Sequence, residues 1–448
     1  MSDLLSIGAS GVRAYQTALN TVSENIANTG TAGYTRRTTT LGQVTSVGSG
    51  INASVATGSN GVTVIGISRS ADTFRSLAVR NAGTDLAKTE TSAAWLGRIE
   101  TSLTDNKLSN RLTSFYTSAQ TLSADPTSIP ARSVMLEAAT TAAASFTATG
   151  QALDTAAADL DESTRQAAQT LNSLGTALAK VNDGIARSQK GSSNAAQLAD
   201  QRDQLLEQMS TLSDINSNFD DLGRVTVRLG GSGGPVFVAG NDAGNLSYFK
   251  NDEGAVAFAL QRNGTTDAVT PSGGALAGFA EGAQRIAAAR DTLNAVATDF
   301  TKQVNDIQAQ GRNLDAQSGA PLFKTGNSPT SITVVLTDPR GIAAAGVTGG
   351  VRDSSNLTAL LATRTSIGTE QRLTNMITSN AAALEQRKLV GDAQGAIRDG
   401  AVTARAASSG VDLDSEAVDL LRFQQAYQAS SRVIQTARDI LQTILEIR

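Results

Sequence analysis

The stretch that decides the fold lies at the start of the chain, where residues 4–26 read LLSIGASGVRAYQTALNTVSENI. Apolar or small residues recur there at alternating steps of three and four, at Leu5, Gly8, Val12, Tyr15, Leu19, Val22 and Ile26. This heptad spacing places one narrow apolar stripe along one side of an α-helix. The pattern predicts a helix over about residues 3–28, which Asn28-Thr29-Gly30 ends.

The end of the chain carries a matching stripe. It consists of Leu413, Leu420, Phe423, Tyr427, Ile434, Ala437, Leu441 and Ile444, and only Glu416 and Ser430 interrupt it. Asp412 or Asp414 can cap this last helix. Because a narrow stripe needs a partner, we expect the two terminal helices to pair with each other. Closing so long a loop costs several kcal/mol by the logarithmic estimate, so we expect the pair to be weak in a free subunit and to form on assembly.

Long helices are expected where the prolines leave room for them. No proline lies between Pro130 and Pro235 or after Pro339, and proline breaks helix interiors. Helical periodicity predicts helices over residues 73–124, 131–188 and 275–310, and from 355 to the end with a break near 408–410. A shorter helix after residue 193 carries Leu198, Leu205, Leu206 and Met209.

Strand patterns fill the remaining segments. Residues 62–67 alternate, and residues 225–229 and 236–238 flank a glycine-rich turn, which predicts a hairpin. Further strands are expected at 249 and 256–260, and residues 320–352 read as loop with a short strand at 332–336. The predicted fold class is mainly α with a smaller β portion, a long antiparallel helical bundle or coiled coil built from both termini plus a mixed α/β outer region.

Four units follow from these patterns. We expect a discontinuous terminal coiled-coil unit from residues 1–72 and 400–448, and a long-helix bundle from residues 73–214 and 275–399. Residues 215–274 form a small β-rich region, and residues 320–352 form a short insert.

Composition removes several classes of function. The 448 residues contain no cysteine and no histidine, so the chain lacks thiolate ligands, the commonest metal ligand and the usual general base. The net charge is −4, and the sequence has no cluster of basic residues of the kind that binds nucleic acid. No apolar run approaches the roughly 20 residues of a membrane span. The first residues lack the pattern of a Sec signal. We therefore expect no enzyme, no catalytic, cofactor-binding or metal-binding residue, no nucleic-acid partner and no membrane insertion.

Three local patterns that resemble functional motifs are expected to be ordinary turns or surface charges. The run Gly230–Gly234 lacks a following Gly-Lys-Ser/Thr, so we expect a hairpin turn and not a phosphate loop. Asp220-Asp221 is expected to be a solvated pair in a turn. Arg202, flanked by Asp200 and Asp203, is expected to belong to a surface charge cluster worth well under about 1 kcal/mol.

Both ends of the chain resemble one family. Residues 4–36 resemble the N-terminal signature of flagellar rod, hook and hook-associated proteins, centred on Asn25-Ile26-Ala27-Asn28 and then Gly33-Tyr34. Residues 409–448 resemble the C-terminal signature of that family, with Ser409-Gly410-Val411-Asp412-Leu413-Asp414, Phe423-Gln424-Gln425-Ala426-Tyr427-Gln428-Ala429 and Val433-Ile434-Gln435-Thr436-Ala437.

Three features are more similar to the hook-associated protein 1 (FlgK) type than to hook or rod proteins. They are Gly33-Tyr34-Thr35-Arg36, then Ser409-Gly410-Val411, and the internal run Leu198–Leu206 followed by residues 273–278. The chain departs from the family pattern at Ala32, where proline is frequent, and at Glu24, where asparagine is common. The short insert at 320–352 stands where many relatives carry a larger β-domain.

The resemblance implies a structural role outside the cell. It implies a subunit of the bacterial flagellum that self-assembles into a ring at the hook–filament junction and lets the filament assemble on the hook. Its implied partners are the hook protein, a second hook-associated protein and a flagellar export chaperone that holds the C-terminal region. It also implies export by the flagellar type III apparatus without a Sec signal. Asn25 and Asn28 then become candidates for backbone capping or for contacts between subunits, and Gly33 is a further candidate contact of the family signature. Tyr34 is either a subunit contact or a loop aromatic that fills a small cluster.

Other readings stay open at this level. Within the same class, the chain could be a hook or flagellin-like subunit. In a second class, it could be a secreted coiled-coil adhesin whose recognition region is residues 215–275. An enzyme such as a wall hydrolase would need a pair of catalytic carboxylates, and the sequence shows no such pair in a glycosidase-like setting.

Overall fold

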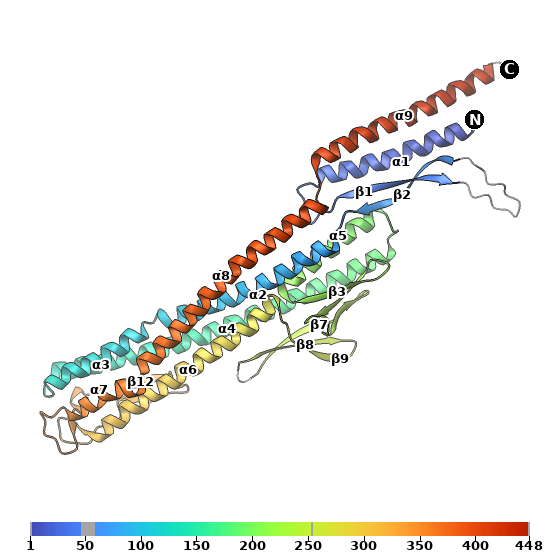
Figure 1. Cartoon of the computed structure of the whole chain (residues 1–448). Helices are drawn as coiled ribbons and strands as arrows, with labels where there is room; N and C mark the ends of the chain where they lie inside the picture. The colour runs from blue at the N-terminus through green and yellow to red at the C-terminus, as the bar shows by residue number, and fades with distance from the viewer. Residues whose placement is uncertain (1, 46–58, 252–253, 447–448) are drawn as a thin grey trace.

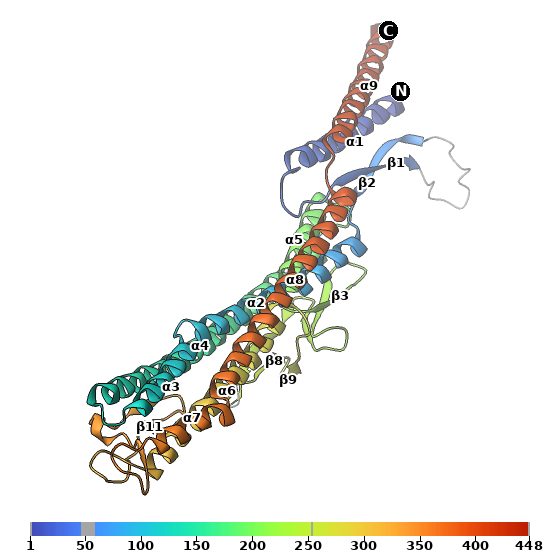
Figure 2. The same ribbon diagram turned by 60° about the vertical axis from the view of Figure 1, so that its left-hand side comes forward.

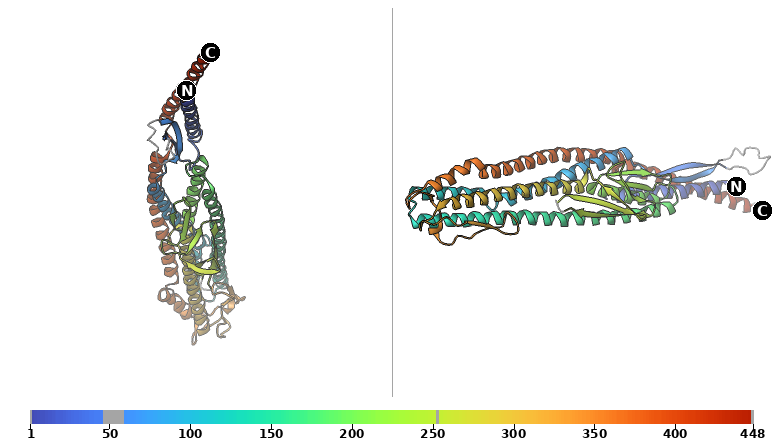
Figure 3. Two further views of the ribbon diagram at one scale, coloured as in Figure 1. Left: turned by 90° about the vertical axis from the view of Figure 1, so that its right-hand side faces the viewer. Right: turned by 90° about the horizontal axis from the view of Figure 1, so that it is seen from below.

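The computed structural model describes residues 2–45, 59–251 and 254–446. The molecule is strongly elongated, and a bundle of long helices runs along most of its length (Figure 3). Both chain ends lie at the same end of the molecule, beyond the bundle (Figure 1). The fold class is mainly α with a smaller β portion, as the sequence predicts.

The helices account for most of the described chain. In chain order they are α1 (Ser2–Ala27), α2 (Thr73–Thr104), α3 (Leu108–Ala124), α4 (Ile129–Arg187), α5 (Ser193–Leu212), α6 (Gly274–Gln310), the short 3-10 helix η1 (Pro339–Gly341), α7 (Ser355–Ile367), α8 (Thr369–Ser409) and α9 (Leu413–Glu446).

The strands form small antiparallel sheets. They are β1 (Arg37–Thr45), β2 (Ser59–Arg69), β3 (Ile215–Phe219), β4 (Val225–Leu229), β5 (Val236–Ala239), β6 (Asp242–Ala243), β7 (Asn245–Lys250), β8 (Val256–Arg262), β9 (Thr265–Val269), β10 (Gly311–Arg312), β11 (Phe323–Thr325), β12 (Ile332–Val334) and β13 (Ala345–Gly346). The sheet orders are β1-β2, β3-β4-β5-β6, β7-β8-β9, β10-β13 and β11-β12.

We call residues 73–409 the body. Its helices α2, α4, α6 and α8 lie side by side along the long axis, and α3, α7 and β12 lie at the end away from the chain termini (Figures 1 and 2). Aromatic rings pack tightly near that far end. Phe300 is 1% exposed, and its ring centroid lies 5.2–5.5 Å from those of Phe115, Phe146 and Phe323.

A second cluster of buried side chains joins the strands of residues 215–269 to α4, α5 and α6. Phe237 of β5 is fully buried, and a Cβ added at Gly175 of α4 would lie 2.6 Å from its ring. Asn182 of α4 donates to the carbonyl of Val225 and accepts from its N–H, both at 2.9 Å. The β-rich region is therefore fixed to the bundle by both apolar and polar contacts.

Most of the helices predicted from periodicity are confirmed, and α4, with its 59 residues, is about 90 Å long. The predicted continuous helix over 73–124 is wrong, because the chain breaks between α2 and α3, where Lys107 has a φ of 52°. The C-terminal helical region has an extra break at Gly368, whose φ of 60° favours glycine. Strand β3 was not predicted, because its sequence INSNF shows no clear apolar alternation.

The strands predicted at residues 62–67, 225–229, 236–238 and 256–260 are confirmed within β2, β4, β5 and β8. Gly230 and Gly231, with φ of 77° and 83°, lie in the turn between β4 and β5, as expected. The segment at 320–352 contains the short strands β11 to β13.

Helices α1 and α9 and the hairpin β1-β2 project from the body at the end where α5 lies (Figures 1 and 2). We call these three elements, with the loop between α1 and β1, the terminal unit. Helix α1 packs against α9 on one side and against β1 and β2 on another. The two halves of the terminal unit come from opposite ends of the sequence.

Candidate functional site

The two terminal helices pair antiparallel. A Cβ added at Gly8 would lie 2.6 Å from Ile434 Cγ1, and one added at Gly11 would lie 2.5 Å from Ser430 Oγ. Further along α1, the ring centroids of Tyr15 and Phe423 are 6.4 Å apart. The residue numbers rise along α1 as they fall along α9. Glycines 8 and 11 therefore let the two backbones approach closely.

The predicted stripes do form the contact, but water reaches most of it. Val22 is buried, whereas Leu5, Val12, Tyr15, Leu19, Leu420, Phe423, Tyr427, Ile434 and Leu441 are only half-buried. The most buried apolar side chains are small ones, namely Ala14, Ala18 and Ala437. Ile444 belongs to α9, but its side chain lies outside what the structure describes.

Two predicted stripe residues do not contribute to the packing. Ile26 is 37% exposed and Leu413 is 52% exposed. At this end of the pair the inward positions are taken by Asn25 and Glu416, which are both fully buried. Since α1 ends at Ala27, its contact with the first turn of α9 is the polar one between Asn25 and Glu416. In the single chain Ile26 and Leu413 therefore lie outside the α1–α9 packing, and their place in an assembly seam stays a prediction.

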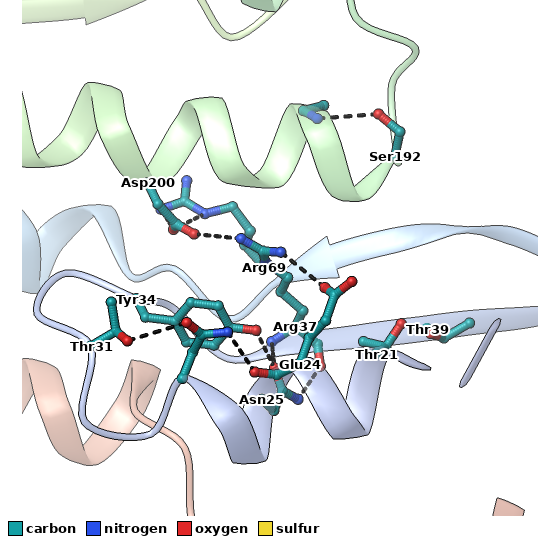
Figure 4. Close-up of polar contacts among 12 residues, drawn as sticks. Thr21, Glu24, Asn25, Thr31, Tyr34, Arg37, Thr39, Arg69, Ser192 and Asp200 are labelled. Carbon is teal, nitrogen blue, oxygen red and sulfur yellow. Dashed lines mark hydrogen bonds and ion pairs between the residues drawn. The ribbon is translucent and has the colours of Figure 1, made fainter. Parts of the chain in front are cut away.

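Asn25 lies at the centre of a buried polar cluster (Figure 4). Its Nδ2 donates to the carbonyl of Arg37 at 2.8 Å, and its Oδ1 accepts from the N–H of the same residue at 3.0 Å. The same Nδ2 donates to Glu416 Oε2 at 2.9 Å, and the hydroxyl of Tyr34 donates to Oδ1 at 2.9 Å. One amide thus fixes the start of β1 and the start of α9 to the end of α1.

Tyr34 is held as a neutral phenol. Burial is the largest influence on its pKa, and with the nearby carboxylates of Glu24, Asp200 and Glu416 it raises the pKa to about 12, although Arg37 opposes this. The Arg37 guanidinium lies 4.8 Å from the ring centroid. A neutral phenol keeps the proton that it donates to Asn25.

Asn28 and Gly33 shape the loop between α1 and β1. Asn28 Nδ2 donates to the carbonyl of Glu24 at 2.8 Å, which caps the last turn of α1. Gly33 has a φ of 75°, and a Cβ there would clash with the side chain of Gln204 in α5. That side chain donates to the carbonyl of Ala32 at 2.6 Å. Both residues therefore make contacts within the chain, and Asn28 caps the backbone of α1.

Glu416 is the residue that interrupts the apolar stripe of α9, and it has a specific partner. Arg36 Nε donates to Glu416 Oε1 at 2.6 Å, and Arg36 Nη2 lies 3.3 Å from Asp419. The Glu416 side chain is 0% exposed. A carboxylate buried to this degree requires charged or hydrogen-bonding partners, which Arg36 and Asn25 supply. Asp412 caps α9 through the N–H of Ser415, at 2.7 Å.

The predicted surface charge cluster in α5 is instead a buried contact between the terminal unit and the body (Figure 4). Asp200 is 6% exposed and Arg202 is 9% exposed. Asp200 Oδ2 lies 3.1 Å from Arg37, and Asp200 Oδ1 lies 2.7 Å from Arg69. Asp203 binds Arg69 at 2.8 Å. Sequence reasoning missed these contacts because the arginines lie more than 130 residues away along the chain.

A backbone contact adds to this attachment. The N–H of Ile67 in β2 donates to the carbonyl of Gly191 at 2.6 Å. A Cβ added at Gly66 would lie 3.2 Å from the Cα of Gly191, whose φ is 75°. The hairpin therefore touches the turn between α4 and α5 through two glycines.

The terminal unit also carries apolar side chains that face solvent. On α9, Val418, Leu421, Val433 and Ile440 are 38–66% exposed, and none of them belongs to the stripe that packs on α1. Leu4, Ile26 and Ile65 are exposed on α1 and β2. An exposed apolar face of this kind on a narrow helical pair is typical of a surface that another protein covers.

Within residues 2–45, 59–251 and 254–446, no group of three or more acidic side chains is arranged to hold a metal ion. No helix in this part of the chain has the length and apolar character that a membrane span requires.

The sequence matches known families at both ends and in the middle. The family model for the flagella basal body rod protein matches residues 5–35. The family model for the C-terminal region of flagellar basal body rod FlgEFG proteins matches residues 404–447. These two matches place the chain in the class of flagellar axial proteins. The model of the flagellar hook-associated protein FlgK helical domain matches residues 96–323, more than half of the chain. The chain therefore belongs to the FlgK family of flagellar hook-associated proteins.

Curated relatives carry the same description. Flagellar hook-associated protein 1 of Salmonella typhimurium is 29% identical over 343 residues, covering 73% of this chain and 60% of the relative. Its counterpart in Escherichia coli K12 is 26% identical over 339 residues with the same coverage. The chain thus spans about 60% of the length of these relatives. The Bacillus subtilis protein of this name is 25% identical over 487 residues, and 95% of it is covered.

Among solved structures, the flagellar hook junction protein FlgK from Burkholderia pseudomallei matches with a TM-score of 0.49 and 22% identity. The match covers 55% of this chain and 46% of that protein.

Proposed function

We propose that this chain is a structural subunit of the bacterial flagellum that assembles into a ring at the hook–filament junction and allows the filament to assemble on the hook. Membership of the FlgK family supports this proposal, since the relatives are named hook-associated protein 1. The hook protein and a second hook-associated protein are its expected neighbours. The absence of histidine and cysteine agrees with a structural role and no enzymatic activity.

The observation that carries the proposal is the construction of the terminal unit. The two family signatures fold onto each other through Asn25, Arg36 and Glu416. The resulting helix pair still exposes Val418, Leu421 and other apolar side chains. Burying such surface gives roughly 25 cal/mol per Å², so neighbouring copies that cover it would stabilise both themselves and the pair.

We propose that the chain is divided into the units expected from sequence, with one adjustment. The terminal unit comprises residues 1–72 and the C-terminal segment, and the long-helix bundle, the β-rich region at 215–274 and the short insert at 320–352 make up the body. Helix α8 continues without a break through residue 400 to Ser409. We therefore move the second boundary of the terminal unit from residue 400 to Gly410.

A deletion strain of the bacterium that encodes the chain tests this function. Cells without the chain are expected to make hooks but to release filament protein into the growth medium, and a plasmid copy should restore filaments. Electron microscopy and analysis of the medium measure both. Normal filaments in the deletion strain, or cells that lack hooks, would rule out the junction role.

Export is part of the same proposal. We infer that the chain leaves the cell through the flagellar type III apparatus, with a cytosolic chaperone holding its C-terminal region, because residues 5–35 and 404–447 match flagellar rod families. Secretion should therefore stop in cells that lack the flagellar export apparatus. Secretion at normal levels from such cells would contradict this route.

A further inference from the structure

Two consecutive arginines, Arg36 just before β1 and Arg37 at its first position, bind in opposite directions. Arg36 reaches Glu416 and Asp419 of the C-terminal helix α9. Arg37 reaches Glu24 of α1, at 3.1 Å, and Asp200 of α5 in the body. Since neighbouring residues of a strand point to opposite faces, this one dipeptide can contact both the C-terminal helix and the body.

Asn25 links the contacts of Arg36 to those of Arg37. Its side-chain amide binds both the N–H and the carbonyl of Arg37, and its Nδ2 also donates to Glu416. If Glu416 is displaced, the amide loses one of its acceptors and Arg36 loses its buried partner. Both changes act on the backbone that carries the Arg37 guanidinium to Asp200. The contacts are therefore continuous from α9 to α5.

The carboxylates at the two ends of this path, Glu416 and Asp200, are sheltered from water. The side chain of Glu416 is 0% exposed and that of Asp200 is 9% exposed, while the side chain of Arg37 is 8% exposed. Removing one partner of a buried ion pair leaves an uncompensated charge, which is strongly destabilising. The cluster is thus more stable with both α9 and α5 in place than with either one alone.

We propose that Arg36, Arg37 and Asn25 form a two-sided clasp that makes docking of α9 onto α1 and docking of the β1-β2 hairpin onto the body mutually dependent. The terminal unit then takes its fixed orientation on the body only when the C-terminal helix is in place. This inference concerns the folded chain itself and does not depend on the proposed role in the flagellum.

Amide hydrogen exchange on the full-length protein tests the coupling. The N–H of Ile67, bound to the carbonyl of Gly191, reports on docking of the hairpin, and the amides of α9 report on docking of that helix. Glu416→Gln keeps the shape of the side chain and removes its charge, although Glu416 touches neither Ile67 nor α5. Exchange at Ile67 should become roughly 5- to 150-fold faster, the range of typical coupling between sites.

The reverse experiment should show the coupling from the other side. Asp200→Asn should speed exchange in α9, because coupling between two equilibria acts in both directions. In the double variant, the loss of docking free energy should be smaller than the sum of the losses in the two single variants. Faster exchange in α9 of Asp200→Asn, together with a non-additive double variant, supports the clasp.

Leu441→Ala serves as the matched control. Leu441 is a half-buried stripe residue near the other end of α9, so its truncation should loosen α9 locally and leave Ile67 unchanged. If Glu416→Gln prevents α9 from folding, as circular dichroism would show, Arg36→Gln replaces it, with the same expected effect at Ile67. Unchanged exchange at Ile67 in both clasp variants, strictly additive effects, or an equal effect of Leu441→Ala would overturn the proposal.

Discussion

The body and the terminal unit are both built from long helices, but different contacts hold them together. In the body, Phe300 is 1% exposed and three other phenylalanine rings lie within 5.5 Å between centroids. In the terminal unit, Tyr15 and Phe423 meet at 6.4 Å and both remain half-buried. The fully buried side chains there include the polar Asn25 and Glu416.

This difference indicates how each region is stabilised. Dense aromatic and aliphatic packing gives the body enough burial to offset the conformational entropy of its own chain. The terminal pair buries mostly alanine and glycine, so it gains less and must also close the loop between the two chain ends. We therefore expect the body to be stable alone and the terminal unit to depend on its clasp and on neighbouring copies.

The largest effect on stability is expected from Phe300→Ala. Removing a fully buried ring should cost about 3–5 kcal/mol of unfolding free energy, because it leaves a cavity among the surrounding rings. The single tryptophan, Trp95, is buried in the same cluster and reports unfolding of the body by its fluorescence during denaturation. Phe249→Ala, at a site that is 53% exposed, should change stability by less than about 0.5 kcal/mol. Equal losses in the two variants would mean that the body lacks the core described.

A second pair of substitutions separates the two faces of α9. Ile434→Asp puts a charge against Gly8 in the stripe and should weaken the terminal pair by about 2 kcal/mol, the lower end of the range for a buried isoleucine, because Ile434 is half-buried. Its neighbour Val433 is 38% exposed, so Val433→Asp should leave the pair intact.

Both variants should prevent assembly while the Trp95 transition of the body stays unchanged. Electron microscopy of cells that carry each variant, together with denaturation of the purified proteins, measures the two properties. Normal filaments with Ile434→Asp would show that the α1–α9 pair is not needed for assembly.

A smaller effect is expected from Gly33→Ala. The φ of 75° costs a residue with a side chain about 1–2 kcal/mol, and the added Cβ also pushes against Gln204. The loss should appear as faster amide exchange in β1. Gly30 is a matched control, since nothing lies within 4 Å of a Cβ added there and its φ is not positive. If Gly30→Ala proves as disruptive as Gly33→Ala, the contact with α5 is not what selects glycine.

The smallest effect is a pH dependence inside the body. Burial alone would raise the pKa of Glu281 in α6, but hydrogen bonding from Ser92 and the charge of Arg387 outweigh it and hold the pKa below its ordinary value of 4.5. The stabilisation is therefore present above about pH 4.5 and is lost as pH falls through the lower folded-state pKa. Because water partly screens the group, the contribution is below about 1 kcal/mol.

Glu281→Gln should flatten the fall in melting temperature below pH 4.5. Glu385→Gln, at an exposed carboxylate of α8, removes the same charge and should leave the pH profile unchanged. Identical pH profiles for the wild type and Glu281→Gln would show that the contacts of Glu281 with Ser92 of α2 and Arg387 of α8 do not stabilise the folded state.

The sequence predicted the helices well because their signal is local. The stripes at Leu5–Val22 and Leu420–Leu441 repeat every three or four residues, so periodicity alone identifies the helices and their inward sides. At the ends of the stripes, Ile26 and Leu413 continue the pattern although both are exposed in the single chain. A pattern along one helix carries no information about where its partner stops.

The clasp could not be predicted in the same way. Arg37 and Asp200 meet across 163 residues of sequence, and Asp200 is preceded and followed by residues typical of an exposed helix. One local signal was available, because Glu416 stands at an inward position of an apolar stripe. A charge in such a position requires a buried partner, but only the fold identifies that partner as Arg36.

Amide hydrogen exchange of the free subunit and of the assembled structure tests the central claim most directly, that the body folds alone whereas assembly stabilises the terminal unit. In the free subunit, α1 and α9 should exchange at least about a hundredfold faster than α4 and α6, because local opening can cost far less than global unfolding. In the assembled structure, α1 and α9 should become as protected as the body. Equal protection of all four helices in the free subunit would contradict the account.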